Sequence, residues 1–136
     1  MNNAELIITL TLIKGLGRKT INKIIRQGVL NSLETIETID YLNNINLKIK
    51  GIITKDELKY ANEVAKRTIE ICDREDIKIS TLLDEDFPQK LKNIDDNPVI
   101  IYSKGDYNNL NDKGVAIIGS RNPSLHGVNV SYKISS

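Results

Sequence analysis

Apolar residues recur at helical spacing through the first half of this chain. Residues 4–13 are apolar nearly all round, and their length together with an opening Asn3 favours a buried helix over a strand. A second stripe, formed by Ile21, Ile24 and Ile25, predicts an amphipathic helix after a short turn. The chain is therefore expected to begin with two helices joined as a hairpin.

Two further helices are expected before residue 75. Gly28 suits the C-terminal cap of the second helix, and residues 33–42 predict a short third one. Thr54 and Glu57 form a capping box, in which the threonine hydroxyl accepts a hydrogen bond from an early helix amide. The fourth helix is then expected to run to about Arg74.

The pattern changes after residue 76, where short apolar runs alternate with turns. Residues 77–81 alternate like a strand, and residues 99–102 form a second short apolar strand. Pro88 lies near the start of a brief helical turn between them. Residues 115–118 are four consecutive apolar residues, which predict a strand buried on both faces.

These patterns divide the chain into two expected domains. An all-α module covers residues 1–75, and the first strands of an α/β domain occupy residues 76–136. The fold class expected for the whole chain is α+β.

Charge is distributed unevenly along the 136 residues, although the net charge is only +1. Five basic residues and no acidic residue lie between Leu6 and Leu33. A local basic segment of this kind is typical of a surface that binds nucleic acid.

Cys72 is the single cysteine, so the sequence offers neither a disulfide framework nor a cysteine-based zinc site. Its place on the apolar stripe of the fourth helix predicts a small core residue, not a nucleophile. No apolar run reaches the length of a membrane span, and the N-terminus has no signal-peptide pattern. A cytoplasmic protein is therefore expected.

The turn between the first two expected helices reads Gly15-Leu16-Gly17 and is followed by Arg18 and Lys19. Glycines can adopt positive φ and expose backbone amides at the start of the second helix. With the positive end of the helix and the two cations, these amides suit a backbone phosphate. The turn resembles that of the helix-hairpin-helix family, which binds DNA backbones. The alternative is that it only lets two helices pack closely, and the residues leave both interpretations open.

A second candidate site follows the expected strand at residues 115–118. The strand stops at Gly119, and Ser120 adds a hydroxyl donor. Arg121 adds a planar cation suited to bidentate phosphate contact, and Ser124 can cap the next helix or donate to a second phosphate. The glycines of this segment do not follow the pattern G-x-G-x-x-G, so the expected ligand is a phosphate and not a dinucleotide cofactor. No metal is expected here.

Three ordered motifs resemble those of the DprA/Smf family of DNA-processing proteins. They are the aromatic-proline segment at residues 86–91, the Pro-apolar-Tyr-x-Lys-Gly segment at residues 96–105, and the strand and Gly-Ser-Arg loop at residues 115–121. Three motifs in this order are more specific than any one of them. The N-terminal hairpin also fits the family pattern, so the resemblance extends over nearly the whole chain.

The resemblance implies a helix-hairpin-helix (SAM-like) module followed by a Rossmann-like domain. It implies a non-enzymatic protein of natural transformation (competence) that binds and protects single-stranded DNA and helps to load RecA onto it. Carried over to this chain, the DNA contacts would be made by the following residues: Gly119, Ser120, Arg121 and Ser124, with Gly15, Gly17, Arg18 and Lys19 on the hairpin.

The family's next motifs have no counterpart before Ser136. We therefore expect the chain to be the front part of a longer protein, truncated within the Rossmann-like domain. Weak DNA binding and loss of the family's homodimer would follow.

Two other functions stay open. Related open α/β folds bind small phosphates with similar loops, so the chain could be a nucleotide- or sugar-phosphate-binding enzyme. However, no acid or base sits at a fixed short spacing from Gly119 beyond His126. Residues 1–75 could also serve only as a packing or protein-interaction module.

Overall fold

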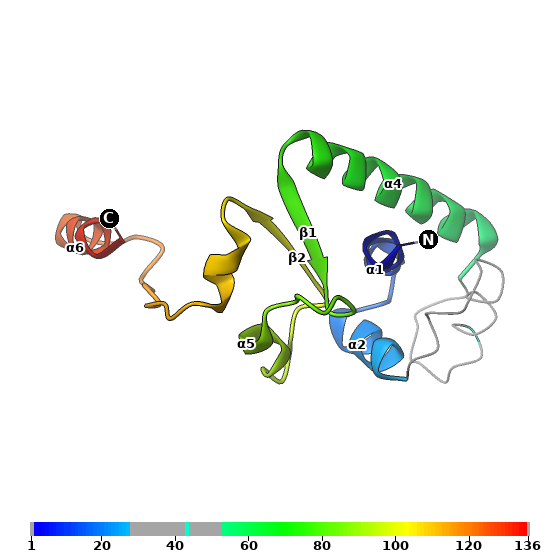
Figure 1. Cartoon of the computed structure of the whole chain (residues 1–136), viewed down its shortest axis with the longest axis horizontal. Coiled ribbons are helices and arrows are strands. Elements are labelled where there is room, and N and C mark those ends of the chain that lie inside the picture. The colour runs from blue at the N-terminus through cyan, green and yellow to red at the C-terminus, as the bar shows by residue number, and fades with distance from the viewer. Residues whose placement is uncertain (1, 28–42, 44–52, 136) are drawn as a thin grey trace.

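The computed structural model describes residues 2–27, 43 and 53–135 (Figure 1). The expected third helix and Gly28 lie outside these residues. The described elements are, in chain order, α1 (Asn3–Leu12), α2 (Arg18–Arg26), α4 (Lys55–Arg74), β1 (Ile77–Thr81), α5 (Gln89–Lys92), β2 (Ile100–Lys104), the 3₁₀ helix η2 (Tyr107–Asn111) and α6 (Leu125–Ser135).

Helix α1 lies at the centre of the packed part of the chain (Figure 1). Helix α4 covers it on one side, and α2 and the sheet lie next to it on the others. Helix α1 contacts α2, α4 and both strands, and Ile7 and Leu10 are fully buried in the core. Because α1 has neighbours on several sides, its apolar residues are needed nearly all round the helix. The predicted buried helix is confirmed. The cap is Asn2 instead of the expected Asn3, because the Asn2 side chain accepts a 2.7 Å hydrogen bond from the Glu5 amide.

Helix α4 begins and ends as its sequence predicts. The Thr54 hydroxyl accepts a 3.2 Å hydrogen bond from the Glu57 amide, which confirms the N-terminal cap. The buried residues of α4 repeat along one face and are Leu58, Ala61, Ala65 and Cys72. Cys72 is thus a core residue, as expected.

Strands β1 and β2 form a two-stranded antiparallel sheet, in which Ile77 pairs with Lys104 and Thr81 pairs with Ile100. Both were predicted, although β2 extends two residues beyond the apolar run. Helices and an antiparallel sheet confirm the α+β class. The helix-hairpin-helix and Rossmann-like assignments, and the domain division near residue 75, stay predictions.

The predicted strand at residues 115–118 is not formed. This segment has no regular secondary structure, and Val115 and Ile118 are 82% and 93% exposed. Within the part of the chain that the structure describes, no strand pairs with it, because β1 and β2 pair only with each other. A strand needs a neighbour for its backbone N–H and C=O groups, so the apolar run stays without a strand partner.

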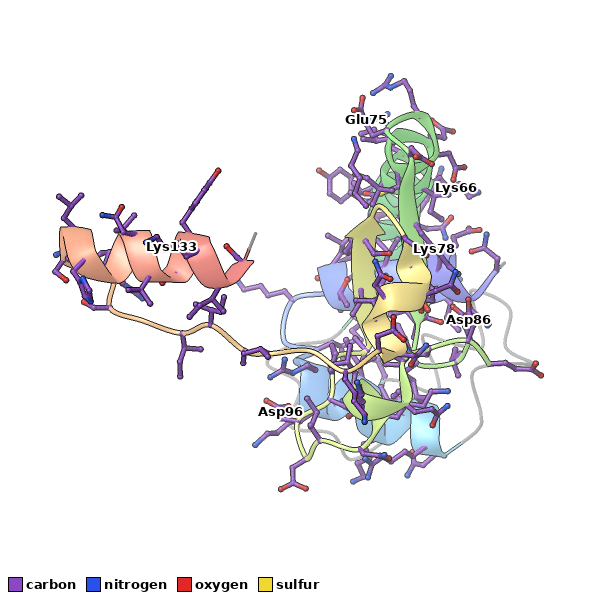
Figure 2. All side chains as sticks on the ribbon, turned by 60° about the vertical axis from the view of Figure 1, so that its left-hand side comes forward. Lys66, Glu75, Lys78, Asp86, Asp96 and Lys133 are labelled. Atoms are coloured by element: carbon purple, nitrogen blue, oxygen red, sulfur yellow. The ribbon has the colours of Figure 1, made fainter. Side chains whose placement is uncertain are left out.

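Polar contacts hold η2 against the sheet, and the chain leaves the packed region after it (Figures 1 and 2). The Lys78 ammonium lies 2.6 Å from the Asp86 carboxylate and 3.6 Å from the centre of the Tyr107 ring. The hydrogen bond to Asp86 raises the pKa of Lys78, so this ammonium stays charged over an extended alkaline range. Figure 2 shows Lys78 and Asp86 near each other, with Lys133 on the separate helix α6.

None of the described helices is both long enough and apolar enough to cross a membrane.

Candidate nucleic-acid interface

The loop at residues 119–124 is shaped by two serine side chains. The Ser120 hydroxyl accepts a 3.2 Å hydrogen bond from the Asn122 amide, which closes a small turn. The Ser124 hydroxyl accepts a 3.2 Å hydrogen bond from the Gly127 amide, at the start of α6. Ser124 therefore caps this helix, which was one of its two expected roles.

The phosphate-binding groups predicted in this loop are exposed. The Arg121 guanidinium has no ion pair or hydrogen bond with any residue that the structure describes. The backbone amides of Gly119, Ser120 and Arg121 likewise donate to no described residue. An added side chain at Gly119 would meet no atom within 4 Å, so its backbone is open to a ligand. The loop can offer amides and one cation to an anion.

The hairpin residues Gly15, Leu16 and Gly17 have clear structural roles. Gly15 has a φ of +96°, a conformation that side chains rarely adopt. Leu16 is buried in the core cluster, and Gly17 is the N-cap of α2. The packing interpretation of this turn thus has a visible basis, while DNA contact by Gly15 and Gly17 stays a prediction.

The two hairpin cations differ in how the fold uses them. Arg18 donates from Nε to Asp96 Oδ1 at 3.0 Å, and its second nitrogen forms an ion pair with the other oxygen of the same carboxylate. This bidentate pair links the start of α2 to the turn before β2. Lys19, by contrast, has no ion pair with any described residue. Of the two, Lys19 is the cation that remains available to a phosphate.

We expect the charge-neutral double variant Arg18→Gln/Asp96→Asn to bind single-stranded DNA within about twofold of the original protein, because an exposed ion pair is already neutralised. Lys19→Gln should lower the salt slope of the binding constant by about 0.7, since one phosphate contact is lost. Fluorescence anisotropy with a labelled oligonucleotide at several salt concentrations measures both. A larger loss of slope in the double variant would show that Arg18 contacts DNA.

The two predicted contact groups are not brought together. The loop at residues 119–124 leads into α6 on one side of the molecule, and α2 lies on the other (Figure 1). Asn22 was not predicted from the sequence, yet its side-chain amide donates to the Asn97 carbonyl at 3.0 Å. No local pattern predicts a contact between residues that are 75 positions apart.

A family model described as DNA recombination-mediator protein A matches residues 78–136 of this chain. The match runs from β1 to the end of α6 and includes the loop at residues 119–124. It supports the resemblance to the DprA family and a role in DNA recombination or processing. Neither the curated proteins nor the solved structures gave a significant match.

Proposed function

We propose that this protein binds single-stranded DNA and acts in DNA processing without catalysing a reaction. The observation that carries the proposal is the unpaired Arg121 guanidinium beside three backbone amides with no internal partner. Such a loop contacts phosphates and leaves the bases unread, so binding should depend weakly on sequence. The family match over residues 78–136 supports the same role.

By the same family resemblance, the bound strand is protected and passed to RecA during natural transformation. A protein with this role has to hold the strand without cutting it. The loop suits that task because it supplies hydrogen-bond donors and a permanent cation but no nucleophile activated by a neighbouring base. We therefore propose DNA and RecA as partners, with no cofactor.

Arg121→Ala tests the proposal. We expect the affinity for single strands of any sequence to fall by about fivefold and the salt slope of log K to decrease by about 0.7, because one phosphate contact is removed. The control is Lys59→Ala, which removes an exposed cation from α4. Anisotropy titrations at several salt concentrations give both quantities. Equal losses in the two variants would remove Arg121 from the interface and overturn the proposal.

A further inference from the structure

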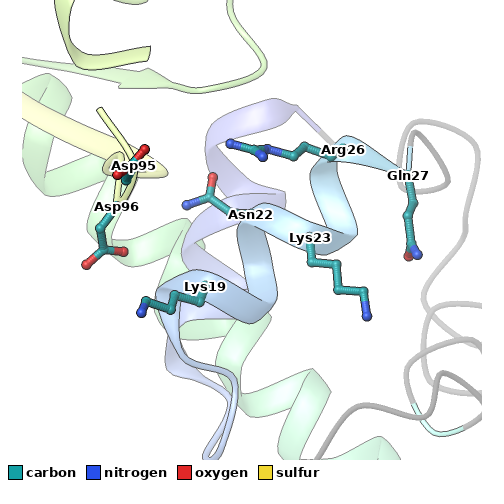
Figure 3. Close-up of a pocket in the computed structure, with 7 residues that line it drawn as sticks. All are labelled: Lys19, Asn22, Lys23, Arg26, Gln27, Asp95 and Asp96. Carbon is teal, nitrogen blue, oxygen red and sulfur yellow. The ribbon is translucent and has the colours of Figure 1, made fainter. Parts of the chain in front are cut away.

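A cavity of about 310 Å³ lies between α2 and the turn that precedes β2. Figure 3 shows Lys19 and Arg26 on either side of Asn22, whose side chain points toward the turn at Asp95 and Asp96. The two walls come from segments that are more than 60 residues apart in sequence. None of the residues that line the cavity belongs to the loop at residues 119–124.

The α2 wall of the cavity is cationic. Lys19, Lys23 and Arg26 line it, and none of them has an ion pair or hydrogen bond with a described residue. On the opposite wall Asp96 is paired with Arg18, which leaves Asp95 as the unpaired carboxylate. The cavity therefore offers cations at one side and an acceptor at the other.

Asn22 supplies a second observation that points to a ligand. Asn22 as a residue is only 7% exposed, and its Nδ2 donates to the Asn97 carbonyl at 3.0 Å, which fixes the orientation of the amide. Its Oδ1 is buried and accepts a hydrogen bond from no group that the structure describes. A buried acceptor without a donor is unfavourable, so a ligand amine that reached this oxygen through a small shift of the Asn22 side chain would gain affinity.

We propose that this cavity binds one nucleotide whose base carries an exocyclic amine. The phosphate would lie against Lys19 and Arg26, and the amine would donate toward the oxygens of Asn22 and Asp95. Cations alone would suit any phosphate, but two acceptors beside them select a ligand that also has N–H donors. Carboxylate and amide oxygens are suitable partners for base amines, as in contacts to the cytosine N4 amine. This site goes beyond the proposed function, because it adds base selection at a place remote from Arg121.

Cytosine and thymine separate the proposal from simple charge attraction, because cytosine has an amine where thymine has a carbonyl oxygen. Full-length protein is titrated with labelled (dC) and (dT) oligonucleotides of about 12 residues, and with dCMP and dTMP. We expect (dC) to bind roughly fivefold more tightly than (dT), a factor typical of one additional hydrogen bond. A preference seen with dCMP over dTMP would show that free nucleotides are bound, and one seen only with oligonucleotides would assign the site to DNA strands. Equal affinity for both bases in both formats would overturn the proposal.

Two variants test the acceptors. Asn22→Leu should abolish the preference for cytosine, provided that circular dichroism shows an unchanged helix content. Asp95→Ala replaces an exposed residue and leaves the buried packing intact, so it provides the test if Asn22→Leu does not fold. It should reduce the preference for cytosine while raising the affinity for thymine, because a negative charge is removed. A preference that survives Asp95→Ala and any folded Asn22→Leu protein would overturn the proposal.

A third variant tests the cations. Lys19→Gln/Arg26→Gln should weaken binding of both oligonucleotides by roughly tenfold and lower the salt slope by about 1.4, for two lost phosphate contacts. The matched control is Lys59→Gln/Arg67→Gln, which removes the same charge from exposed positions of α4. Equal effects of the two double variants would show attraction by net charge alone and overturn the proposal. Arg121→Ala should leave the preference for cytosine unchanged, so failure of the proposed function would not be mistaken for failure of this site.

Discussion

Replacing Phe87 with alanine is expected to lower the free energy of unfolding by about 3–5 kcal/mol. Phe87 is 1% exposed and is the largest of the fully buried side chains in the described residues. Removing most of its ring takes away apolar burial and leaves a cavity that the surrounding chain fills only in part. Urea denaturation followed by circular dichroism measures the change at constant temperature.

The control for Phe87→Ala is Tyr60→Ala on α4. Tyr60 is also aromatic but is 71% exposed, so its replacement should change the free energy of unfolding by no more than about 0.5 kcal/mol. Comparable losses in the two variants would contradict the burial of Phe87. Phe87 belongs to the segment at residues 86–91 that resembles the DprA/Smf family. A large effect would therefore identify a packing role for the aromatic residue of that motif.

Leu10→Ala is expected to lower the free energy of unfolding by about 3 kcal/mol. Leu10 is fully buried in the core cluster, on the helix that contacts both α4 and the sheet. The loss is a large share of the stability of a domain of this size, which is about 5–15 kcal/mol. The midpoint of urea denaturation should fall while the slope of the transition stays constant.

Leu12→Ala, in the last turn of the same helix, is the matched control for Leu10→Ala. Leu12 is 46% exposed, so the same change of side chain should have a clearly smaller effect, about 1 kcal/mol or less. Helix propensity favours alanine slightly at both positions and does not distinguish them. An effect of Leu12→Ala as large as that of Leu10→Ala would contradict the burial of Leu10 in the core.

The candidate site was only partly predictable. Gly119, Ser120 and Arg121 were predicted as phosphate contacts from adjacent residues whose chemistry suits a phosphate. The structure leaves their backbone amides and the Arg121 guanidinium without a described partner, while the Ser120 hydroxyl bonds to Asn122. Arg18 looked equally available in the sequence, but the fold pairs it with Asp96, 78 positions away. Asn22 gave no signal, because an asparagine on an apolar stripe is meaningful only once its neighbours are known.

The sequence by itself determined the elements whose causes are local. The apolar spacing of α1, α2 and α4, the threonine cap of α4 and the alternation of β1 each depend on residues within a few positions of one another. Tertiary structure decided whatever requires a distant partner. Residues 115–118 have the composition of a buried strand, yet they stay irregular and exposed because no other described strand supplies their hydrogen bonds. The cavity beside α2 likewise exists only because folding brings Asn22 next to the turn before β2, a contact that no local pattern encodes.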